Sequence, residues 1–257
     1  SADQAFAPVP LIAVPTTSGT GSEVTSWATV WDSVGSRKFS LNLPGLYPTH
    51  AIVDPELMLG KPRLLTISTG LDALSHAMES LWNVNANPIS AQFAVAAARA
   101  IIEVLPSLAD DLGNLELRTR MARAALFAGL AFSNTKTAIA HSLSYPMTLR
   151  HGVPHGIACS FSLPMIIRSV AGESGICGEG LRAIFGTDIG KAADQLEAFL
   201  NALGVATDYH HYGIGEQEWR ELIADAFDGE RGQNFIGRRE ALLAVAGGEG
   251  RKQMAVA

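Results

Sequence analysis

At residues 70–79 the chain reads Gly70-Leu71-Asp72-Ala73-Leu74-Ser75-His76-Ala77-Met78-Glu79, and this stretch decides the fold that we expect. It lies in a segment rich in helix-forming residues that predicts a helix from near Ser68 to Trp82. Asp72 and His76 are four residues apart, so a helix places both side chains on one face. A carboxylate and an imidazole at this spacing suit a divalent transition metal, although a cap or surface ion pair is the more frequent use of such a pair.

The chain beyond this stretch has the composition and spacing of further helices. Asn87-Pro88 is a cap followed by proline at the first helical position, which predicts a helix that runs to about Leu105. Clusters of Gly, Pro, Asp and Asn separate the helices that follow. We expect these at about 115–133, 136–148, 156–170, 189–203, 216–227 and 236–246.

The chain before this stretch is richer in strand signals. Val9 to Val14 reads as one buried strand that enters a turn-rich loop. Residues 27–31 and 38–43 carry β-branched and aromatic side chains around a Gly-Ser turn and predict a hairpin, and Ala51 to Val53 predicts a further short strand. The chain as a whole is therefore expected to be mainly α-helical, with a strand-rich portion up to about residue 60.

Two more histidines, His141 and His155, extend the metal hypothesis. His141 lies in an apolar helical stretch, where a lone histidine is usually a core residue, and His155 lies between proline and glycine at a predicted helix start. Together with Asp72 and His76 they supply four nitrogen and oxygen donors, which suit Fe(II), Zn(II), Mn(II) or Ni(II). One carboxylate neutralises one of the two metal charges, and the remaining charge is available to a substrate oxygen.

The loop Pro15-Thr16-Thr17-Ser18-Gly19-Thr20-Gly21-Ser22-Glu23 follows the first predicted strand. Its glycines permit close backbone approach and its hydroxyls can donate to phosphate or ribose, so the edge of a nucleotide site is one interpretation. The spacing fits neither the P-loop nor the dinucleotide fingerprint. A plain glycine-rich turn is equally open on these grounds.

Composition narrows the class of partner. The chain has 257 residues, of which 47% are hydrophobic, and this is ample for a buried core. A net charge of -6 argues against nucleic acid, so small molecules are the expected partners. The longest apolar stretch, Phe93 to Leu105, contains Arg99 and Glu103, and no membrane span is predicted. The start lacks a secretory signal, and the chain's only cysteines, Cys159 and Cys177, suggest no disulfide framework, so a cytoplasmic location is expected.

These segments, in this order, resemble the iron-containing alcohol dehydrogenase family, whose members share a fold with dehydroquinate synthase and glycerol dehydrogenase. Pro15 to Glu23 is similar to the threonine-rich cofactor loop of that family, and Ala51 to Leu57 to its Ala-Ile-Val-Asp-Pro-Glu-Leu segment. Gly70 to Glu79 is similar to its first metal motif and Pro154-His155-Gly156 to its second. The resemblance covers essentially the whole chain.

The resemblance implies an NAD(P)-dependent, metal-dependent alcohol dehydrogenase or aldehyde reductase that forms homo-oligomers. It implies that Fe(2+), or Zn(2+) or another divalent metal, is held by Asp72, His76, His141 and His155. It also implies that NAD(H) or NADP(H) is contacted by a second set of residues, which are Thr16, Thr17, Thr20, Thr25 and Lys38. The substrate would be a small aldehyde or alcohol.

Two departures from the family pattern affect these expectations. Many members carry a histidine four residues after the third ligand, where this chain has Tyr145. Members also have an amino-terminal α/β nucleotide-binding domain with a Gly-Gly-Gly-Ser pyrophosphate turn. We therefore expect residues 1–60 to be a remnant of that domain, with residues 61–257 forming the helical metal-binding catalytic domain. We also expect the chain alone to bind metal but to bind the cofactor poorly.

Residues 140–148 and 152–156 are most similar to the branch that reduces phosphonoacetaldehyde to hydroxyethylphosphonate. A dianionic substrate needs cations near the metal, and Lys136, Arg150 and His151 flank the ligand segments. Solvated charges at helix ends are an equally open interpretation of these cations. His151 or Tyr145 could start a proton relay to solvent.

Three other functions compete with this interpretation. A lyase of the dehydroquinate synthase type would share the helical metal domain, but the segments resemble the alcohol dehydrogenases more. A non-heme oxygenase uses two histidines and one carboxylate, and the fourth ligand His155 argues against it. A non-catalytic metal-binding fragment of a dehydrogenase is the third alternative.

Overall fold

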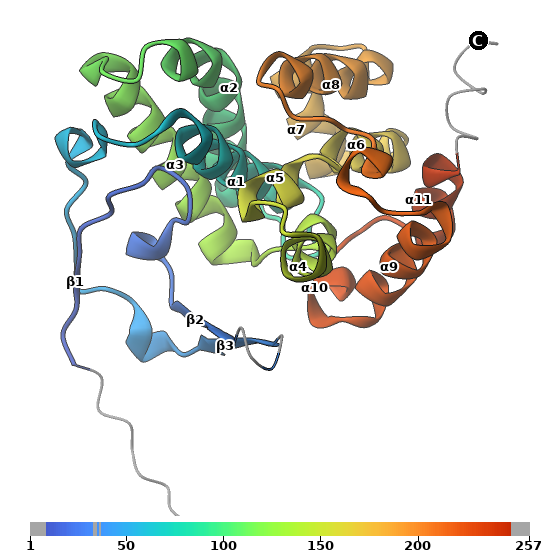
Figure 1. Cartoon of the computed structure of the whole chain (residues 1–257), viewed down its shortest axis with the longest axis horizontal. Helices are drawn as coiled ribbons and strands as arrows, with labels where there is room; N and C mark the ends of the chain where they lie inside the picture. Colours follow the sequence, from blue (N-terminus) through green and yellow to red (C-terminus); the bar gives the residue numbers. More distant parts are fainter. Residues whose placement is uncertain (1–8, 33–34, 36, 248–257) are drawn as a thin grey trace, which may run out of the picture.

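The computed structural model describes residues 9–32, 35 and 37–247, with Trp31, Arg37 and Lys38 described by their backbone alone. Helices dominate this part of the chain, as expected (Figure 1). The longer helices are α1 (Arg63–Leu81), α2 (Pro88–Asp110), α3 (Leu115–Thr135), α4 (Ile139–His151), α5 (His155–Ser160), α6 (Leu163–Val170), α7 (Gly175–Phe185), α8 (Ala192–Ala202), α9 (Glu216–Asp228), α10 (Glu230–Gln233) and α11 (Arg239–Ala246). Single-turn 3-10 helices are η1 (Ser22–Val24), η2 (Pro44–Leu46), η3 (Pro55–Met58), η4 (Ile189–Lys191) and η5 (Tyr209–Tyr212).

The strand-rich portion forms two small sheets. Strands β2 (Trp27–Asp32) and β3 (Arg37–Asn42) form the expected antiparallel hairpin, with Trp27 opposite Asn42. Strand β1 (Ile12–Ala13) pairs in parallel with β4 (His50–Ala51). Both strands are shorter than expected, since only two residues of the 9–14 segment are paired and the partner strand ends at Ala51. The prolines at positions 10 and 15 flank β1 and cannot donate a ladder hydrogen bond, which limits its length.

Helices α2 and α3 begin at their caps, whereas α1 begins at Arg63, five residues before the expected start at Ser68, and has no side-chain cap. The Asn87 side chain accepts hydrogen bonds from the N–H groups of Ile89 and Ser90, and Ser90 caps Asn87 in return, so α2 starts at Pro88. Asn114 caps α3 in the same manner by accepting from Leu117. Helix α2 ends at Asp110, five residues later than expected, and retains Pro106 in its interior. Burial of the apolar side chains around Pro106 stabilises this last part of the helix.

Two predicted helices were placed incorrectly, and one helix was not predicted. The expected helix at 156–170 is divided into α5 and α6 by a turn just before Pro164, and the helix expected at 136–148 runs over Ile139–His151. Lys136 has a φ of 67°, so its left-handed backbone ends α3. Helix α7 was missed because its glycines predict a loop. It forms through packing, with Gly180 against the Leu81 side chain.

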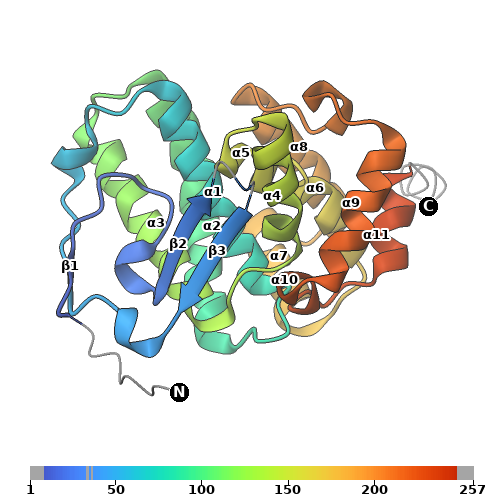
Figure 2. The same ribbon diagram turned by 60° about the horizontal axis from the view of Figure 1, so that its bottom comes forward.

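Helix α1 is the centre of the fold. Every residue from Gly70 to Leu81 is buried, and α1 contacts α2, α3 and α5 directly. The strand-rich portion lies on one side of α1, and α9 and α11 lie on the other (Figures 1 and 2). Side chains of Asp72 and His76 therefore occupy the middle of the molecule, where charged groups need partners.

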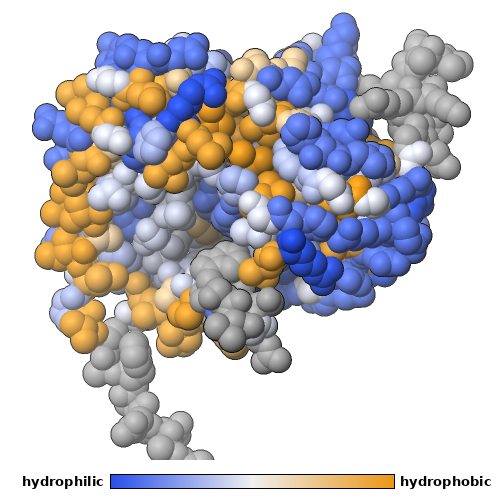
Figure 3. Space-filling view, in the orientation of Figure 1, coloured by the Kyte–Doolittle hydropathy of each residue, from blue (hydrophilic) through white to orange (hydrophobic). Residues whose placement is uncertain are grey.

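Apolar surface remains on the side of β1. Large side chains on this segment, such as Leu11, Ile12, Val14 and Ile52, are exposed, and Figure 3 shows a band of hydrophobic surface there. Helix α2 is long and apolar enough to cross a membrane by length and composition. It packs between α1 and α3, however, and core helices of soluble proteins pass the same test. The absence of a membrane span therefore stays a prediction.

Gly156 provides a test of how α5 is held on α1. A Cβ at this position would overlap the carbonyl oxygen of Ser68, so Gly156→Ala should push α5 away from α1. Overpacking of this kind costs about 1–3 kcal/mol, although alanine favours a helix interior by about 1 kcal/mol over glycine. We expect a net loss of stability, and each 1 kcal/mol lowers the melting temperature by about 2–4 °C in a chain of this size.

The matched control is Gly172→Ala, where no atom lies within 4 Å of the added Cβ. Thermal unfolding of both variants checks the prediction. An unchanged or higher melting temperature for Gly156→Ala would show that the α1–α5 contact is less close than the structure indicates.

Candidate metal centre

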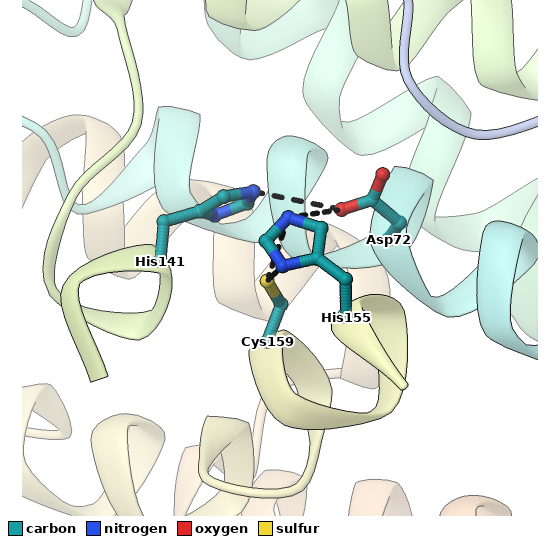
Figure 4. Close-up of side chains that lie close together, drawn as sticks. All are labelled: Asp72, His141, His155 and Cys159. Carbon is teal, nitrogen blue, oxygen red and sulfur yellow. Dashed lines mark hydrogen bonds and ion pairs between the residues drawn. The ribbon is translucent and has the colours of Figure 1, made fainter. Parts of the chain in front are cut away.

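Four side chains from three helices meet beside α1. Asp72 and His76 come from α1, His141 from the first turn of α4 and His155 from the first residue of α5. The Oδ1 atom of Asp72 lies 3.5 Å from His141 Nε2, 3.8 Å from His76 Nε2 and 3.9 Å from His155 Nε2. Figure 4 shows His141 and His155 pointing toward the Asp72 carboxylate. The structure thus brings together all four ligands that the sequence predicts.

The distances between these donor atoms suit shared coordination of a metal ion better than direct hydrogen bonds between the side chains. Donors held about 2.1 Å from a tetrahedral ion are separated by about 3.4 Å, close to the observed separations. Direct hydrogen bonds would be shorter, at about 2.7–3.2 Å. Within the described part of the chain, Asp72 Oδ1 and His141 Nε2 are buried and lack a hydrogen-bond partner. Buried polar atoms are rarely left in this state, so a ligand for both atoms is the simplest account.

Glu79 is the residue that holds His141 in place. Its side chain is fully buried, and its Oε2 atom lies 2.6 Å from His141 Nδ1. Its Oε1 atom accepts hydrogen bonds from the backbone N–H groups of Ala140 at 2.6 Å and His141 at 3.1 Å. An Nδ1–H that donates to Glu79 leaves the lone pair on His141 Nε2, which faces Asp72. The carboxylate therefore selects the tautomer that can bind a metal.

The charges of the cluster are set by burial and by each other. Burial acts to raise the pKa of Asp72, but the neighbouring imidazoles, His76 foremost, hold it below its ordinary value. Burial lowers the pKa of His76 to about 4, so its ring stays neutral. Burial opposes protonation of His141, yet the Cys159 thiolate and Glu79 raise its pKa well above the ordinary value. A metal that binds at neutral pH must therefore displace a proton from the cluster.

Cys159 adds a sulfur atom next to the predicted ligands. It lies one turn after His155 on α5, and its Sγ atom is 3.7 Å from His155 Nε2 (Figure 4). Burial acts to raise the pKa of this thiol, but His141 and His155 lower it to about 7. Ligand atoms of Asp72, His141, His155 and Cys159 all lie within 4.8 Å of one another. The cluster thus offers five donors, of which one is a sulfur.

The cluster opens into a cavity of about 350 Å³ between the strand-rich portion and the helices. Two aromatic rings line it next to the proposed ligands. Phe132 stacks on His76 with 4.0 Å between ring centroids, and Tyr145 lies parallel to His155 at 6.3 Å. Burial raises the pKa of Tyr145 to about 12, so the phenol keeps its proton.

The threonine-rich loop reaches this cavity through only part of its length. Thr20 and Thr25 line the cavity, together with Ser22, whereas Thr16 and Thr17 are not among the lining residues. Lys38 is in β3, and its side chain lies outside the described part of the structure.

The glycines of the threonine-rich loop allow the loop to pack closely against two helices. Gly21 has a φ of 59°, and a Cβ there would lie 2.7 Å from the Cα of Gly129 on α3. A Cβ on Gly19 would lie 2.8 Å from Thr69 on α1. These glycines bring the loop onto the same helices that frame the metal cluster.

The structure does not bring the three predicted substrate cations into this cavity. Lys136 forms an ion pair with Glu230 at 3.1 Å, and His151 pairs with Glu218 at 2.9 Å. Arg150 is exposed. Each lies at a helix end, where the alternative interpretation of a solvated or paired charge describes it better.

A different cation, Arg231 of α10, lines the cavity instead. Its guanidinium carbon lies 5.0 Å from the ring centroid of Tyr145 and 5.8 Å from that of Trp27. Sequence analysis missed Arg231, and it gave no role to Glu79 or Cys159. The helical spacing offered a signal for the last two. Glu79 is three residues after His76 and Cys159 four after His155, so each shares a helix face with a predicted ligand.

Comparison with known proteins agrees with this geometry. Residues 66–240 match the model of the Fe-containing alcohol dehydrogenase family, C-terminal, and residues 2–55 match the model of iron-containing alcohol dehydrogenase. The chain belongs to the iron-containing alcohol dehydrogenase family. The first of these matches spans the four predicted ligands and Glu79.

Two curated relatives are similar over most of the chain. The NAD-dependent methanol dehydrogenase of Bacillus methanolicus is 36% identical over 232 residues, which is 86% of this chain and 60% of that protein. The phosphonoacetaldehyde reductase of Streptomyces viridochromogenes is 34% identical over 231 residues, which is 85% of this chain and 58% of that protein. The chain therefore spans about three fifths of the length of these relatives.

Solved structures show the same fold. A 1,3-propanediol oxidoreductase has a TM-score of 0.85 at 27% identity. The sulfoacetaldehyde reductase of Bifidobacterium kashiwanohense, solved in complex with NAD+, has a TM-score of 0.83 at 31% identity. Each comparison covers 95% of this chain and 67% of the other chain. The mainly helical class expected from the sequence is confirmed.

The role of Glu79 can be tested by Glu79→Gln. A glutamine amide directed at His141 Nδ1 would donate a hydrogen bond, which favours the tautomer with its proton on Nε2. Loss of such a partner typically weakens metal affinity by about 10–100-fold. Titration of metal-free protein with Fe(2+) and Zn(2+) measures this change. Glu103→Gln is the matched control, because Glu103 is exposed and pairs with Arg120 far from the cluster. Wild-type affinity in Glu79→Gln would contradict the assigned role.

Proposed function

We propose that this chain supplies the metal-binding part of an NAD(P)-dependent alcohol dehydrogenase that interconverts a small aldehyde and its alcohol. One observation carries the proposal. Three imidazoles and one carboxylate converge at metal-ligand separations on the wall of a cavity, and two of the atoms that face each other, Asp72 Oδ1 and His141 Nε2, are buried with no hydrogen-bond partner in the described residues. Family membership supports it, as do the dehydrogenase and reductase names of the relatives.

We assign the metal to Asp72, His76, His141 and His155. A divalent ion bound there would supply Lewis-acid chemistry for a carbonyl or alcohol oxygen, and a bound nicotinamide would supply the hydride chemistry. Neutral imidazoles leave much of the charge of such an ion uncompensated, because Asp72 contributes a single negative charge. Glu79 is a positioning residue that acts through His141.

The remaining cavity residues bind and orient. Tyr145 retains its proton at neutral pH and can donate a hydrogen bond to a substrate oxygen or to water. The hydroxyls of Thr20 and Thr25 line the cavity on the side of the strand-rich portion, where we place the nicotinamide end of the cofactor. Thr16, Thr17 and Lys38 remain proposed cofactor contacts on the resemblance alone. His151 is paired with Glu218 outside this cavity, so Tyr145 is the better candidate for a proton relay.

The finer proposal for the substrate is phosphonoacetaldehyde. It rests on the segment 140–156 and on the named reductase that is 34% identical. The dehydrogenase of Bacillus methanolicus is similar to the same extent, so the choice between charged and uncharged substrates needs a residue-level argument. Association of identical chains and a cytoplasmic location also stay predictions.

Metal removal tests the proposed activity. The complete gene product that contains this chain, stripped with a chelator and dialysed, should lose aldehyde reduction with NADH and NADPH. Fe(2+) should restore activity, because the ligands remain in place. Protein carried through the same dialysis without chelator is the control. Full activity in protein that elemental analysis shows to be metal-free would contradict the proposal.

A pair of variants distinguishes His76 from Cys159 as the fourth ligand. His76→Ala should lower metal affinity by more than the roughly 10–100-fold effect of losing a supporting contact. Cys159→Ser should leave it within about tenfold, because the four nitrogen and oxygen donors remain. Metal titration followed by elemental analysis compares the two. The opposite ranking would assign the site to Asp72, His141, His155 and Cys159.

A further inference from the structure

Arg231 is a cation in the wall of the cavity, and it has no role in the metal site proposed above. It lies on α10, and its side chain is half-buried between the rings of Trp27 and Tyr145. Its Nε atom donates a hydrogen bond to Thr137 Oγ1 at 3.0 Å. Within the ranges that the structure describes, its two terminal nitrogens make no hydrogen bond and it forms no ion pair.

The neighbouring carboxylate does not neutralise this cation. Glu230 precedes Arg231 in the chain but pairs with Lys136 at 3.1 Å, and Lys136 is not among the lining residues of the cavity. The only carboxylate among those lining residues is Asp72, which we assign to the metal. Two aromatic rings and one hydroxyl thus hold the Arg231 guanidinium, and its two terminal nitrogens have no hydrogen-bond partner among the described residues. They can donate two parallel hydrogen bonds to an oxyanion.

Tyr145 connects this cation to the metal cluster. One tyrosine ring contacts the Arg231 guanidinium, and the same ring lies parallel to the imidazole of the proposed ligand His155. Both groups therefore belong to one wall of the cavity. A small molecule that places an oxygen at the cluster can extend toward Arg231 along this wall.

We propose that Arg231 is a specificity-determining residue that binds an oxyanion group of the substrate. The substrate class is then a small aldehyde, or its alcohol, that carries a carboxylate, sulfonate or phosphonate. This inference rests on the proposed dehydrogenase function, because the aldehyde end is placed at the metal cluster. Two positive centres, the ion and Arg231, face one cavity that contains a single metal-binding carboxylate, which favours an anionic substrate over an uncharged one of equal size.

The test compares Arg231→Gln with wild type in the complete, metal-loaded gene product. The probes are sulfoacetaldehyde and phosphonoacetaldehyde as anionic aldehydes and propanal as an uncharged aldehyde of similar size. Loss of a charge-assisted contact should lower kcat/KM for the anionic aldehydes by about 10–100-fold, mainly through KM. The value for propanal should change by less than about threefold.

Two further variants keep the result interpretable. Arg231→Lys retains the charge without the planar fork and should preserve part of the preference for anions. Arg150→Gln makes the same chemical change at an exposed arginine outside the cavity and should leave the preference unchanged. Equal losses on charged and uncharged aldehydes in Arg231→Gln would overturn the inference, as would loss of anion preference in Arg150→Gln alone.

A binding measurement separates this inference from the proposed function. Calorimetric titration of the metal-loaded protein with 2-hydroxyethanesulfonate should show tighter binding than titration with 1-propanol, and Arg231→Gln should remove the difference. If wild type shows this binding but no turnover of any aldehyde, the dehydrogenase proposal fails while the anion site stands. If wild type binds the sulfonate no more tightly than 1-propanol, the anion site fails.

Discussion

One buried carboxylate joins the two helices that carry three of the four proposed metal ligands. Glu79 is fully buried on α1 and accepts hydrogen bonds from the first turn of α4 and from the His141 ring. An unpaired carboxylate in this position would cost several kcal/mol, whereas the unsatisfied N–H groups of a helix start stabilise it. The register of α4 on α1 is therefore fixed, and with it the direction of His141. The short connection after α4 then brings His155 to the same point.

Periodicity in the sequence was sufficient for most of the fold. The caps at Asn87 and Asn114 are local, so the starts of α2 and α3 were predicted correctly. The sequence-based predictions failed where contacts between distant segments outweigh the local helix propensity of the residues. Helix α7 keeps three glycines because one of them allows close contact with Leu81, and the division between α5 and α6 places both helices against different neighbours. No local signal reports such contacts between distant segments.

The candidate site was predictable where ligands recur at helical spacing and unpredictable where contacts span the chain. Asp72 and His76 share a face by their spacing, and His141 and His155 followed from the resemblance. Arg150 was proposed because it is close to His141 in sequence. At about 100° per residue, however, nine residues along α4 place it on the opposite side of the helix. Arg231 reaches the cavity through contacts with Trp27 and Tyr145, about 200 and 90 residues away in the chain, which one sequence cannot reveal.

Close backbone contacts join the segment before residue 60 to the helices after it. Gly21 allows the threonine-rich loop to contact α3 at Gly129, and Gly19 allows it to contact α1 at Thr69. Thr69 lies about two turns before the proposed ligand His76 and less than one turn before Asp72, so the loop rests on the same helix that carries these two side chains. A displacement of that loop would therefore move the hydroxyls proposed to bind the cofactor. It would also disturb the packing of α1, the helix that carries two of the proposed ligands. The glycines thus hold the loop, through packing, against the two helices α1 and α3 beside the metal cluster.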